Sequence, residues 1–213
     1  MSNETTITLF HAPNTRSSGT LILLEELGAP YELRVLNMQA GEQRQPAFLA
    51  VNPMGKVPAI LHGDVLVTEQ VAVFLYLADL FPVAGLTPVP GDKRRGAYLR
   101  WMAFYAGCFE PAVVDRAMKR DPAPVIMSPY GDFDRVIATL TEQLRAGPFI
   151  LGADFSVADV LWGSALGWTT MFGLVPKTPE IVAYIERTTK RPAFVWVREQ
   201  DAALAAQQKT QPA

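Results

Sequence analysis

Short apolar runs alternate with helical periodicities over the first 40 residues. Residues 7–10 (ITLF) are apolar and β-prone and predict a strand, and residues 31–38 (YELRVLNM) alternate and predict a second strand. Between them, the leucines of residues 20–28 (TLILLEELG) recur at helical spacing and stop at Gly28, a residue that favours a helix C-terminus. The predicted order is strand, helix, strand.

A hairpin and a helix follow. Residues 56–69 (KVPAILHGDVLVTE) contain two apolar runs around the turn formed by residues 62–64, which predicts an antiparallel hairpin. Residues 69–81 (EQVAVFLYLADLF) predict a helix that ends before Pro82, whereas the polar residues 41–48 leave room for only a short helix. The first 80 residues therefore predict a small α/β domain that combines a parallel strand pair with an antiparallel hairpin.

The pattern changes at residue 82. Residues 82–91 (PVAGLTPVPG) hold three prolines and two glycines and predict an extended, stiff linker. Beyond it, helical patterns cover residues 92–118, 130–145, 156–172, 179–189 and 192–207, and no strand pattern occurs after Val67. The predicted organisation is an α/β domain over residues 1–81, a linker over 82–91 and an all-helical domain over 92–213.

Composition excludes several classes of protein. The 213 residues are 49% hydrophobic. The net charge is −2, and lysine and arginine are scattered apart from one short cluster at residues 93–95, so the sequence shows no basic stripe for a nucleic acid. A single cysteine, Cys108, excludes a disulfide within the chain and a cysteine-rich metal site. The N-terminus lacks the pattern of a signal peptide, and no apolar run approaches the roughly 18 residues of a membrane span. We expect a cytoplasmic protein that binds no metal, nucleic acid or membrane.

Two polar segments of the α/β domain predict a site for a small peptide. In residues 52–60 (NPMGKVPAI), Pro58 opens a strand; a cis bond after Val57 would expose the backbone there, and a trans proline at an edge strand is the alternative. Residues 68–70 (TEQ) open the following helix, whose N-terminal N–H groups favour a carboxylate. Together they offer strand-like pairing and an anion site.

Three motifs in these and later segments resemble the cytosolic glutathione S-transferases. They are NPMGKVPAI at residues 52–60, VLVTEQVAVFLYL at 65–77 and ILGADFSVADVLWG at 150–163, and the resemblance covers nearly the whole chain. It implies a thioredoxin-like N-terminal domain, a helical C-terminal domain, a homodimer and glutathione bound to the first domain.

The resemblance also implies roles for five residues. The backbone of Val57 would pair with the cysteinyl part of glutathione before a cis Pro58, and Lys56 would lie near the glycine carboxylate. Glu69 and Gln70 would hold the γ-glutamyl end. Most members of the family have serine at the position of Gln70, whose amide can still donate a hydrogen bond.

The residue that activates the thiol of glutathione is not evident from the motifs. A thiol with a pKa near 8.5 is mostly protonated at about pH 7, so it needs a hydrogen-bond donor or a positive charge nearby that lowers its pKa. Phe10 occupies the family's tyrosine position and has no hydroxyl. The serine-type position falls on Asn14 and a bacterial cysteine-type position on Arg16. We favour Asn14 and Thr15 as donors, with Arg16 and Ser17 behind them; the alternative is that Thr15 or Ser17 is only the helix N-cap.

Other chemical residues have structural alternatives. His11 could act as a base, but a lone histidine at a strand end is more often structural. Cys108 lies in an aromatic helical stretch that indicates a buried thiol, and the absence of a CxxC motif argues against a dithiol mechanism. The spacing of Ser156 and Asp159 is that of a capping box, which indicates a folding role.

Contacts with an electrophile are expected from the helical domain. Tyr105 and Phe109 share one helix face, a stripe that is more often core than ligand site. In the family, the first helix of this domain lines an acceptor pocket, so the resemblance makes Tyr105, Phe109 and Arg116 candidates, with Trp168 and Met171 from a later helix.

The predicted function is transfer of glutathione to hydrophobic electrophiles. Two alternatives remain open. One is a glutathione-dependent disulfide or peroxide reductase, and the other is a non-catalytic interaction protein on the same fold, which the substitutions at Phe10 and Gln70 motivate.

Overall fold

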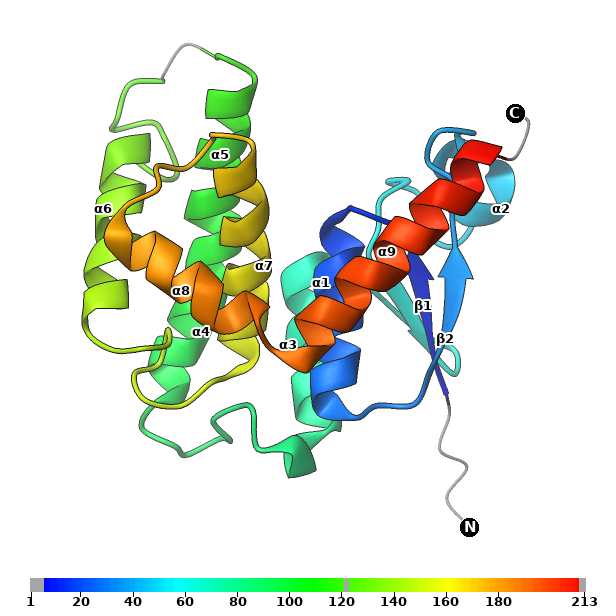
Figure 1. Ribbon diagram of the computed structural model, residues 1–213, viewed down its shortest axis with the longest axis horizontal. Coiled ribbons are helices and arrows are strands. Elements are labelled where there is room, and N and C mark those ends of the chain that lie inside the picture. Colours follow the sequence, from blue (N-terminus) through cyan, green and yellow to red (C-terminus); the bar gives the residue numbers. More distant parts are fainter. Residues whose placement is uncertain (1–5, 121–122, 211–213) are drawn as a thin grey trace. The chain divides into compact units, whose positions relative to one another are not determined.

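A computed structural model of the chain describes residues 6–120 and 123–210 and divides into two compact units (Figure 1). The first unit comprises the described residues up to Ala84 together with the C-terminal helix α9 (Pro192–Thr210). The second unit runs from Gly85 to Arg191. The chain therefore leaves the first unit and returns to it at its end.

The first unit is built on a four-stranded sheet with the order β2-β1-β3-β4. The strands are β1 (Ile7–His11), β2 (Tyr31–Val35), β3 (Ala59–His62) and β4 (Val65–Thr68). β1 and β2 are parallel, whereas β3 is antiparallel to both β1 and β4. Parallel strands need a long crossover connection, which α1 (Arg16–Leu27) provides. The predicted thioredoxin-like arrangement is confirmed.

Helices of the first unit begin and end where their capping residues predict. Thr15 caps the N-terminus of α1 by accepting a hydrogen bond from the N–H of Ser17, and Gly28 ends the helix in the left-handed conformation with a φ of 62°. In the region expected to hold only a short helix, a 3-10 turn (Glu42–Arg44) precedes the four-residue α2 (Pro46–Leu49). Helix α3 (Gln70–Leu80) follows the hairpin as predicted.

Helix α9 packs along α1 and belongs to the first unit (Figure 1). Its Phe194, Val197 and Asp201 are buried. This differs from the division expected from sequence, which grouped residues 192–207 with the other helices, because periodicity shows that a helix has a buried face but not what covers it. The expected domains over residues 1–81 and 92–213, joined by a linker over residues 82–91, stay a prediction.

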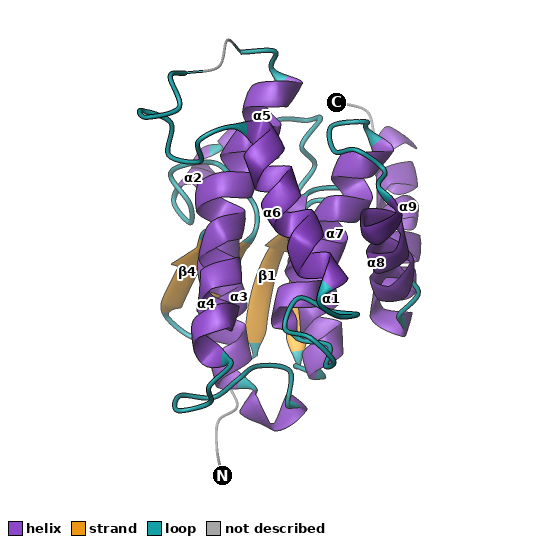
Figure 2. Cartoon of the chain, turned by 90° about the vertical axis from the view of Figure 1, so that its left-hand side faces the viewer, coloured by secondary structure: helices purple, strands orange, loops and turns teal. Residues whose placement is uncertain are grey.

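The second unit is helical (Figure 2). Its helices are α4 (Arg95–Phe104), α5 (Glu110–Ala117), α6 (Phe133–Arg145), α7 (Val157–Met171) and α8 (Pro179–Thr189). The prediction of one helix over residues 92–118 is wrong in detail, because the helix starts at Arg95 and widens into a π-turn at Tyr105–Phe109. Pro111 follows this turn and has no N–H to donate to the preceding turn, which accounts for the irregularity.

Aromatic rings and one carboxylate hold the second unit together. The Trp162 ring lies 5.0–6.3 Å from the rings of four residues on α4 and the π-turn, namely Trp101, Phe104, Tyr105 and Phe109. The fully buried Asp159 accepts the N–H and the hydroxyl of Ser156, both at 2.8 Å, which confirms the expected capping pair. Its other oxygen accepts the N–H of Ile150 at 2.7 Å and the hydroxyl of Tyr184 at 2.8 Å.

No helix in the described part of the chain is both long and apolar enough to cross a membrane.

Candidate functional site

The register of the sheet brings three separate segments to one edge. Phe10, near the end of β1, pairs with Ala59 at the start of β3, and Ala59 pairs with Thr68 at the end of β4. The loop after β1, the residues before β3 and the residues after β4 therefore leave the sheet side by side. These are the segments that carry the predicted donors, Val57 with Pro58, and Glu69 with Gln70.

The segment before β3 is held by a turn around Asn52. The Val57–Pro58 peptide bond is cis, as the family resemblance implies. The buried Asn52 donates from its side-chain amide to the carbonyl of Lys56 at 2.8 Å and accepts the N–H of Met54 at 3.1 Å. The Lys56 side chain is exposed. Asn52 thus fixes the backbone that precedes Val57, a role that the sequence analysis did not identify.

Gly55 closes this turn because no side chain fits there. Its φ is 61°, and a Cβ atom would lie 2.7 Å from the carbonyl oxygen of Gln43. Both the conformation and the close approach require glycine.

Helix α3 presents its N-terminus at the same edge. Glu69 precedes the helix with φ 65° and ψ 117°, an uncommon conformation for a residue with a side chain. Its side chain forms no capping hydrogen bond in the described part of the molecule. The amide of Gln70 donates to the carbonyl of Arg16 at 3.2 Å, which links the first turns of α3 and α1. The two helix N-termini therefore lie close together, and both favour negative charge.

Hydroxyls in the loop after β1 are used within the loop. Thr15 donates to the carbonyl of Ala12 at 2.8 Å and caps α1. Ser17 is fully buried, and its hydroxyl lies 2.8 Å from that of Thr15, 2.9 Å from Nδ1 of His11 and 3.1 Å from the N–H of Ala12. Its burial makes the Ser17 hydroxyl inaccessible in this structure, which argues against the predicted role of Ser17 as a thiol donor. For Thr15, it supports the N-cap alternative.

Asn14 is the predicted donor that the loop leaves exposed. Its φ is 58°, in the left-handed region that asparagine tolerates better than most residues, and its side chain is exposed. Among the described residues, its amide side chain forms no hydrogen bond, whereas its backbone N–H donates to Asp201 at 2.9 Å. Arg16 follows one residue after the N-cap and is also exposed. Asn14 and Arg16 are therefore the accessible polar groups at this helix entry.

Asp201 of α9 lies beneath the loop and was not identified from sequence. One of its oxygens contacts Nε2 of His11 at 2.9 Å, and the other accepts the hydroxyl of Ser18 at 2.5 Å. Burial opposes the negative charge, but the hydrogen bonds from His11, Ser18 and Asn14 outweigh it and lower the pKa of Asp201. His11 is fully buried, so the structure supports its structural interpretation.

Two of the predicted electrophile contacts belong to the core of the second unit. Tyr105 and Phe109 are 3% and 1% exposed, and both rings pack against Trp162. The hydroxyl of Tyr105 donates to Glu110. This packing favours the core alternative for both residues. Cys108 lies between them and is half-buried, and burial raises the pKa of its thiol.

The other predicted contacts remain accessible. The guanidinium of Arg116 lies 4.4 Å from the centre of the Phe133 ring, on the exposed side of α5. Trp168 and Met171 are 42% and 69% exposed near the end of α7, and the Trp168 ring lies 5.1 Å from that of Phe172. Trp168, Met171 and Phe172 are therefore exposed apolar side chains at the end of α7.

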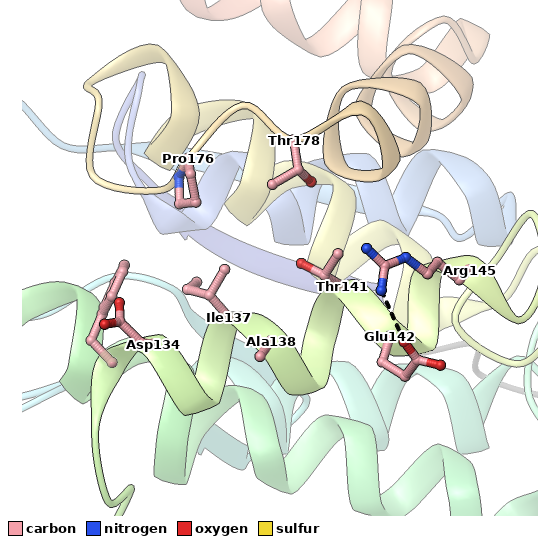
Figure 3. Close-up of a pocket in the computed structure, with 9 residues that line it drawn as sticks. Asp134, Ile137, Ala138, Thr141, Glu142, Arg145, Pro176 and Thr178 are labelled. Atoms are coloured by element: carbon pink, nitrogen blue, oxygen red, sulfur yellow. Dashed lines mark hydrogen bonds and ion pairs between the residues drawn. The ribbon is translucent and has the colours of Figure 1, made fainter.

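A separate hollow of about 520 Å³ lies along α6 (Figure 3). Ile137 and Thr141 face it from α6, with Pro176 and Thr178 on the opposite side. Arg145 lies at one end and is paired with Glu142 at 3.0 Å. None of the residues predicted to bind glutathione or an electrophile lines this hollow.

Comparison with known proteins identifies the family. Residues 5–79 match the N-terminal domain of glutathione S-transferases, and residues 111–187 match their C-terminal domain. The fold matches a crystal structure of a glutathione transferase from Methylococcus capsulatus with a TM-score of 0.79 and 30% identity, covering 93% of this chain and 100% of that one. The chain therefore belongs to the glutathione S-transferase family.

Two further relatives bear on the chemistry. A sphingomonad glutathione S-transferase, solved in complex with glutathione, matches with a TM-score of 0.75 and 30% identity over 92% of this chain and 98% of that one. The disulfide-bond oxidoreductase YfcG of Escherichia coli is 28% identical over 201 residues, which cover 88% of this chain and 92% of the relative.

Proposed function

We propose that this protein binds glutathione at the sheet edge, lowers the pKa of its thiol and transfers it to hydrophobic electrophiles. The observation that carries the proposal is the register of β1, β3 and β4, which juxtaposes the β1–α1 loop, the cis Val57–Pro58 bond and Glu69. The glutathione-bound sphingomonad relative supports it.

Each part of glutathione has a matching group. The backbone of Val57 pairs with the cysteinyl part, and Lys56 lies near the glycine carboxylate. The γ-glutamyl carboxylate binds at the N-terminus of α3, where the side chain of the N-cap residue Glu69 forms no capping hydrogen bond, with Glu69 and Gln70 beside it. The Gln70 amide, which bonds to Arg16, joins this site to the loop that activates the thiol.

Activation falls to the exposed side chain of Asn14 at the N-terminus of α1. An amide donor and the positive end of a helix both favour a thiolate over a thiol. The thiolate attacks an electrophilic carbon, forms a carbon–sulfur bond and displaces a leaving group such as a halide with its electron pair.

Arg116, Trp168 and Met171 are the proposed contacts for the electrophile. As the family resemblance implies, we extend the proposal to a homodimeric, cytoplasmic protein that uses no metal.

The proposal is tested by an ultraviolet difference titration of bound glutathione between about pH 5 and 9, around the ordinary thiol pKa. We expect thiolate absorbance well below about pH 8 in the wild type. Asn14→Gly tolerates the φ of 58° and removes only the amide, so it isolates the donor. We expect this variant to bind glutathione with a raised thiol pKa, and Thr15→Ala to lose stability instead. If the wild type does not bind glutathione, the proposal fails and a non-catalytic interaction protein remains.

Reduction of disulfides by glutathione is the second candidate. The hydroxyls of Thr15 and Ser17 are both used within the loop, whereas the amide of Asn14 and the guanidinium of Arg16 are exposed, and either can stabilise a thiolate without reacting with it. The similarity to YfcG points in the same direction. In this chemistry, two glutathione thiols reduce one disulfide and leave as glutathione disulfide, with two thiols released. Comparing turnover of a small disulfide with that of an aromatic halide decides between the two reactions.

A further inference from the structure

A buried hydrogen-bond network connects the last helix to the candidate thiol-activating loop. Asp201 accepts the backbone N–H of Asn14 at 2.9 Å and the hydroxyl of Ser18 at 2.5 Å, and its second oxygen contacts His11 at 2.9 Å. The other ring nitrogen of His11 lies 2.9 Å from the hydroxyl of Ser17. His11 and Ser17 are fully buried and Asp201 is 3% exposed. All the members belong to the first unit.

The order Ser17, His11, Asp201 has the spacing of a nucleophile, a base and an orienting acid. Its burial argues against that chemistry, since neither Ser17 nor His11 offers any surface to a substrate. The hydroxyl of Ser17 also lies within hydrogen-bond distance of Thr15 and of both backbone groups of Ala12. The network is therefore an anchor within the fold.

The network holds the backbone N–H of Asn14, the predicted thiol donor. The side chain of Asn14 is exposed while its N–H is fixed by a carboxylate beneath the loop. The same carboxylate also forms hydrogen bonds with His11, which precedes Asn14 in the sequence, and with Ser18, which follows it. A charged acceptor makes these bonds stronger than neutral ones. Three fixed points define the orientation of a short loop.

We propose that Asp201 is a positioning residue for thiol activation, which holds the β1–α1 loop so that the Asn14 amide faces the glutathione sulfur. This inference rests on the proposed function and deepens it, because it assigns control of the thiol to a helix at the far end of the chain. A positioning role and a direct electrostatic role of Asp201 predict opposite changes in the pKa of the glutathione thiol. A buried carboxylate near the site repels a thiolate, so a purely electrostatic role would raise the thiol pKa, whereas a positioning role lowers it.

The test replaces Asp201 by asparagine, which keeps the shape and removes the charge and one acceptor. Glu199→Gln is the matched control, because Glu199 is an exposed carboxylate on the same helix. The first measurement is hydrogen exchange of the loop amides in the full chain without ligand, where we expect Asn14 to exchange at least about tenfold faster in Asp201→Asn only. The second is the ultraviolet titration of bound glutathione, where we expect the thiol pKa to rise by about half a unit or more.

The two measurements separate the possible results. We expect the affinity for glutathione to change less than about twofold, because α3 and Val57 are untouched. An unchanged Asn14 exchange rate, an unchanged thiol pKa or a lowered thiol pKa would each overturn the proposal. Should Asp201→Asn fail to fold, Ser18→Ala removes a single bond to the carboxylate and is expected to shift both readouts in the same direction by less. A wild type that binds no glutathione refutes the proposed function and with it the role in thiol activation, whatever the exchange data show for the anchor.

Discussion

Asp159 and Asp201 are both buried, and each accepts hydrogen bonds from groups that are separate in sequence. Asp159 joins Ile150, Ser156 and Tyr184 within the second unit, whereas Asp201 joins the β1–α1 loop to α9. Leaving a buried donor without an acceptor costs about 1–3 kcal/mol per group. Single substitutions at these two positions therefore test how each unit is held.

Asp159→Asn is expected to lower the free energy of unfolding by about 2 kcal/mol or more, since the amide cannot accept all of the bonds that the carboxylate accepts. Urea denaturation measures the change. Asp154→Asn serves as the control, because the Asp154 side chain is 77% exposed and pairs with Arg94 at the surface, so we expect little effect. A similar loss in the two variants would contradict a specific role for Asp159.

The stability contributed by Asp201 is expected to depend on pH. Its folded-state pKa is lowered by its hydrogen bonds in spite of burial, below the value of about 3.9 in an unfolded chain. The ionised carboxylate therefore contributes stability above about pH 4, and that contribution is lost as the pH falls through the lower folded pKa. We expect the difference in unfolding free energy between wild type and Asp201→Asn to narrow below about pH 4. A difference that stays constant down to pH 3 (about one unit lower) would contradict this sign.

At the scale of elements, α7 and α8 approach closely at Gly163. A Cβ atom there would lie 2.6 Å from the hydroxyl of Thr188 and 2.8 Å from its Cβ, and Thr188 is fully buried. Four residues along the same helix, a Cβ at Gly167 would meet Thr189 at an ordinary 3.7 Å. Gly167 therefore serves as the control for a substitution at Gly163, because both lie in α7 but only Gly163 lacks room for a side chain.

Gly163→Ala is expected to destabilise the protein by about 1–3 kcal/mol through overpacking. Gly167→Ala is expected to be neutral or to stabilise by about 0.5–1 kcal/mol, because alanine favours a helix over glycine. Thermal unfolding of both variants measures the contrast. Equal effects at the two positions would show that α7 and α8 can separate without cost.

Sequence reasoning predicts the elements well and their partners less well. The strand and helix patterns predict β1 to β4, α3 and α6 to α8 within a few residues, because each has an unambiguous period and a capping or breaking residue. The π-turn at Tyr105–Phe109 was missed, since no period marks it and only Pro111 hints at an irregularity. The packing of α9 against α1 could not be predicted, because the period of a helix does not say which surface it covers.

Some residues of the candidate site could be predicted from the sequence and others could not. Val57, Pro58, Glu69 and Gln70 could be predicted because they lie in short contiguous motifs, although their role as a glutathione site stays a prediction. Asp201 could not be predicted, because the bond to His11 spans 190 positions and no local pattern accompanies it. The accessibility of Asn14 relative to Ser17 also depends on folding, since both are small polar residues three positions apart in one polar segment.

For the whole molecule, the return of α9 to the first unit predicts that this unit is incomplete without residues 192–213. Burying large side chains such as Phe194 and Val197 contributes about 1.5–3 kcal/mol each, a large share of a total of about 5–15 kcal/mol. We expect a chain that ends at Arg191 to lose amide protection over residues 6–84 and to keep it over residues 85–191, as measured by hydrogen exchange. Removal of residues 211–213 alone is the control. Full protection of residues 6–84 in the shorter chain would show that the first unit folds without α9 packed against α1.

The distance along the chain between His11 and Asp201 also sets an order of events during synthesis. A ribosome adds about 5–20 residues per second, so the 190 positions between these residues take roughly 10–40 s to make. Throughout that interval the β1–α1 loop has been translated, but Asp201, the acceptor of the Asn14 N–H, has not. The candidate glutathione site is therefore completed last, and a nascent or prematurely terminated chain carries the motifs of the family without a finished site.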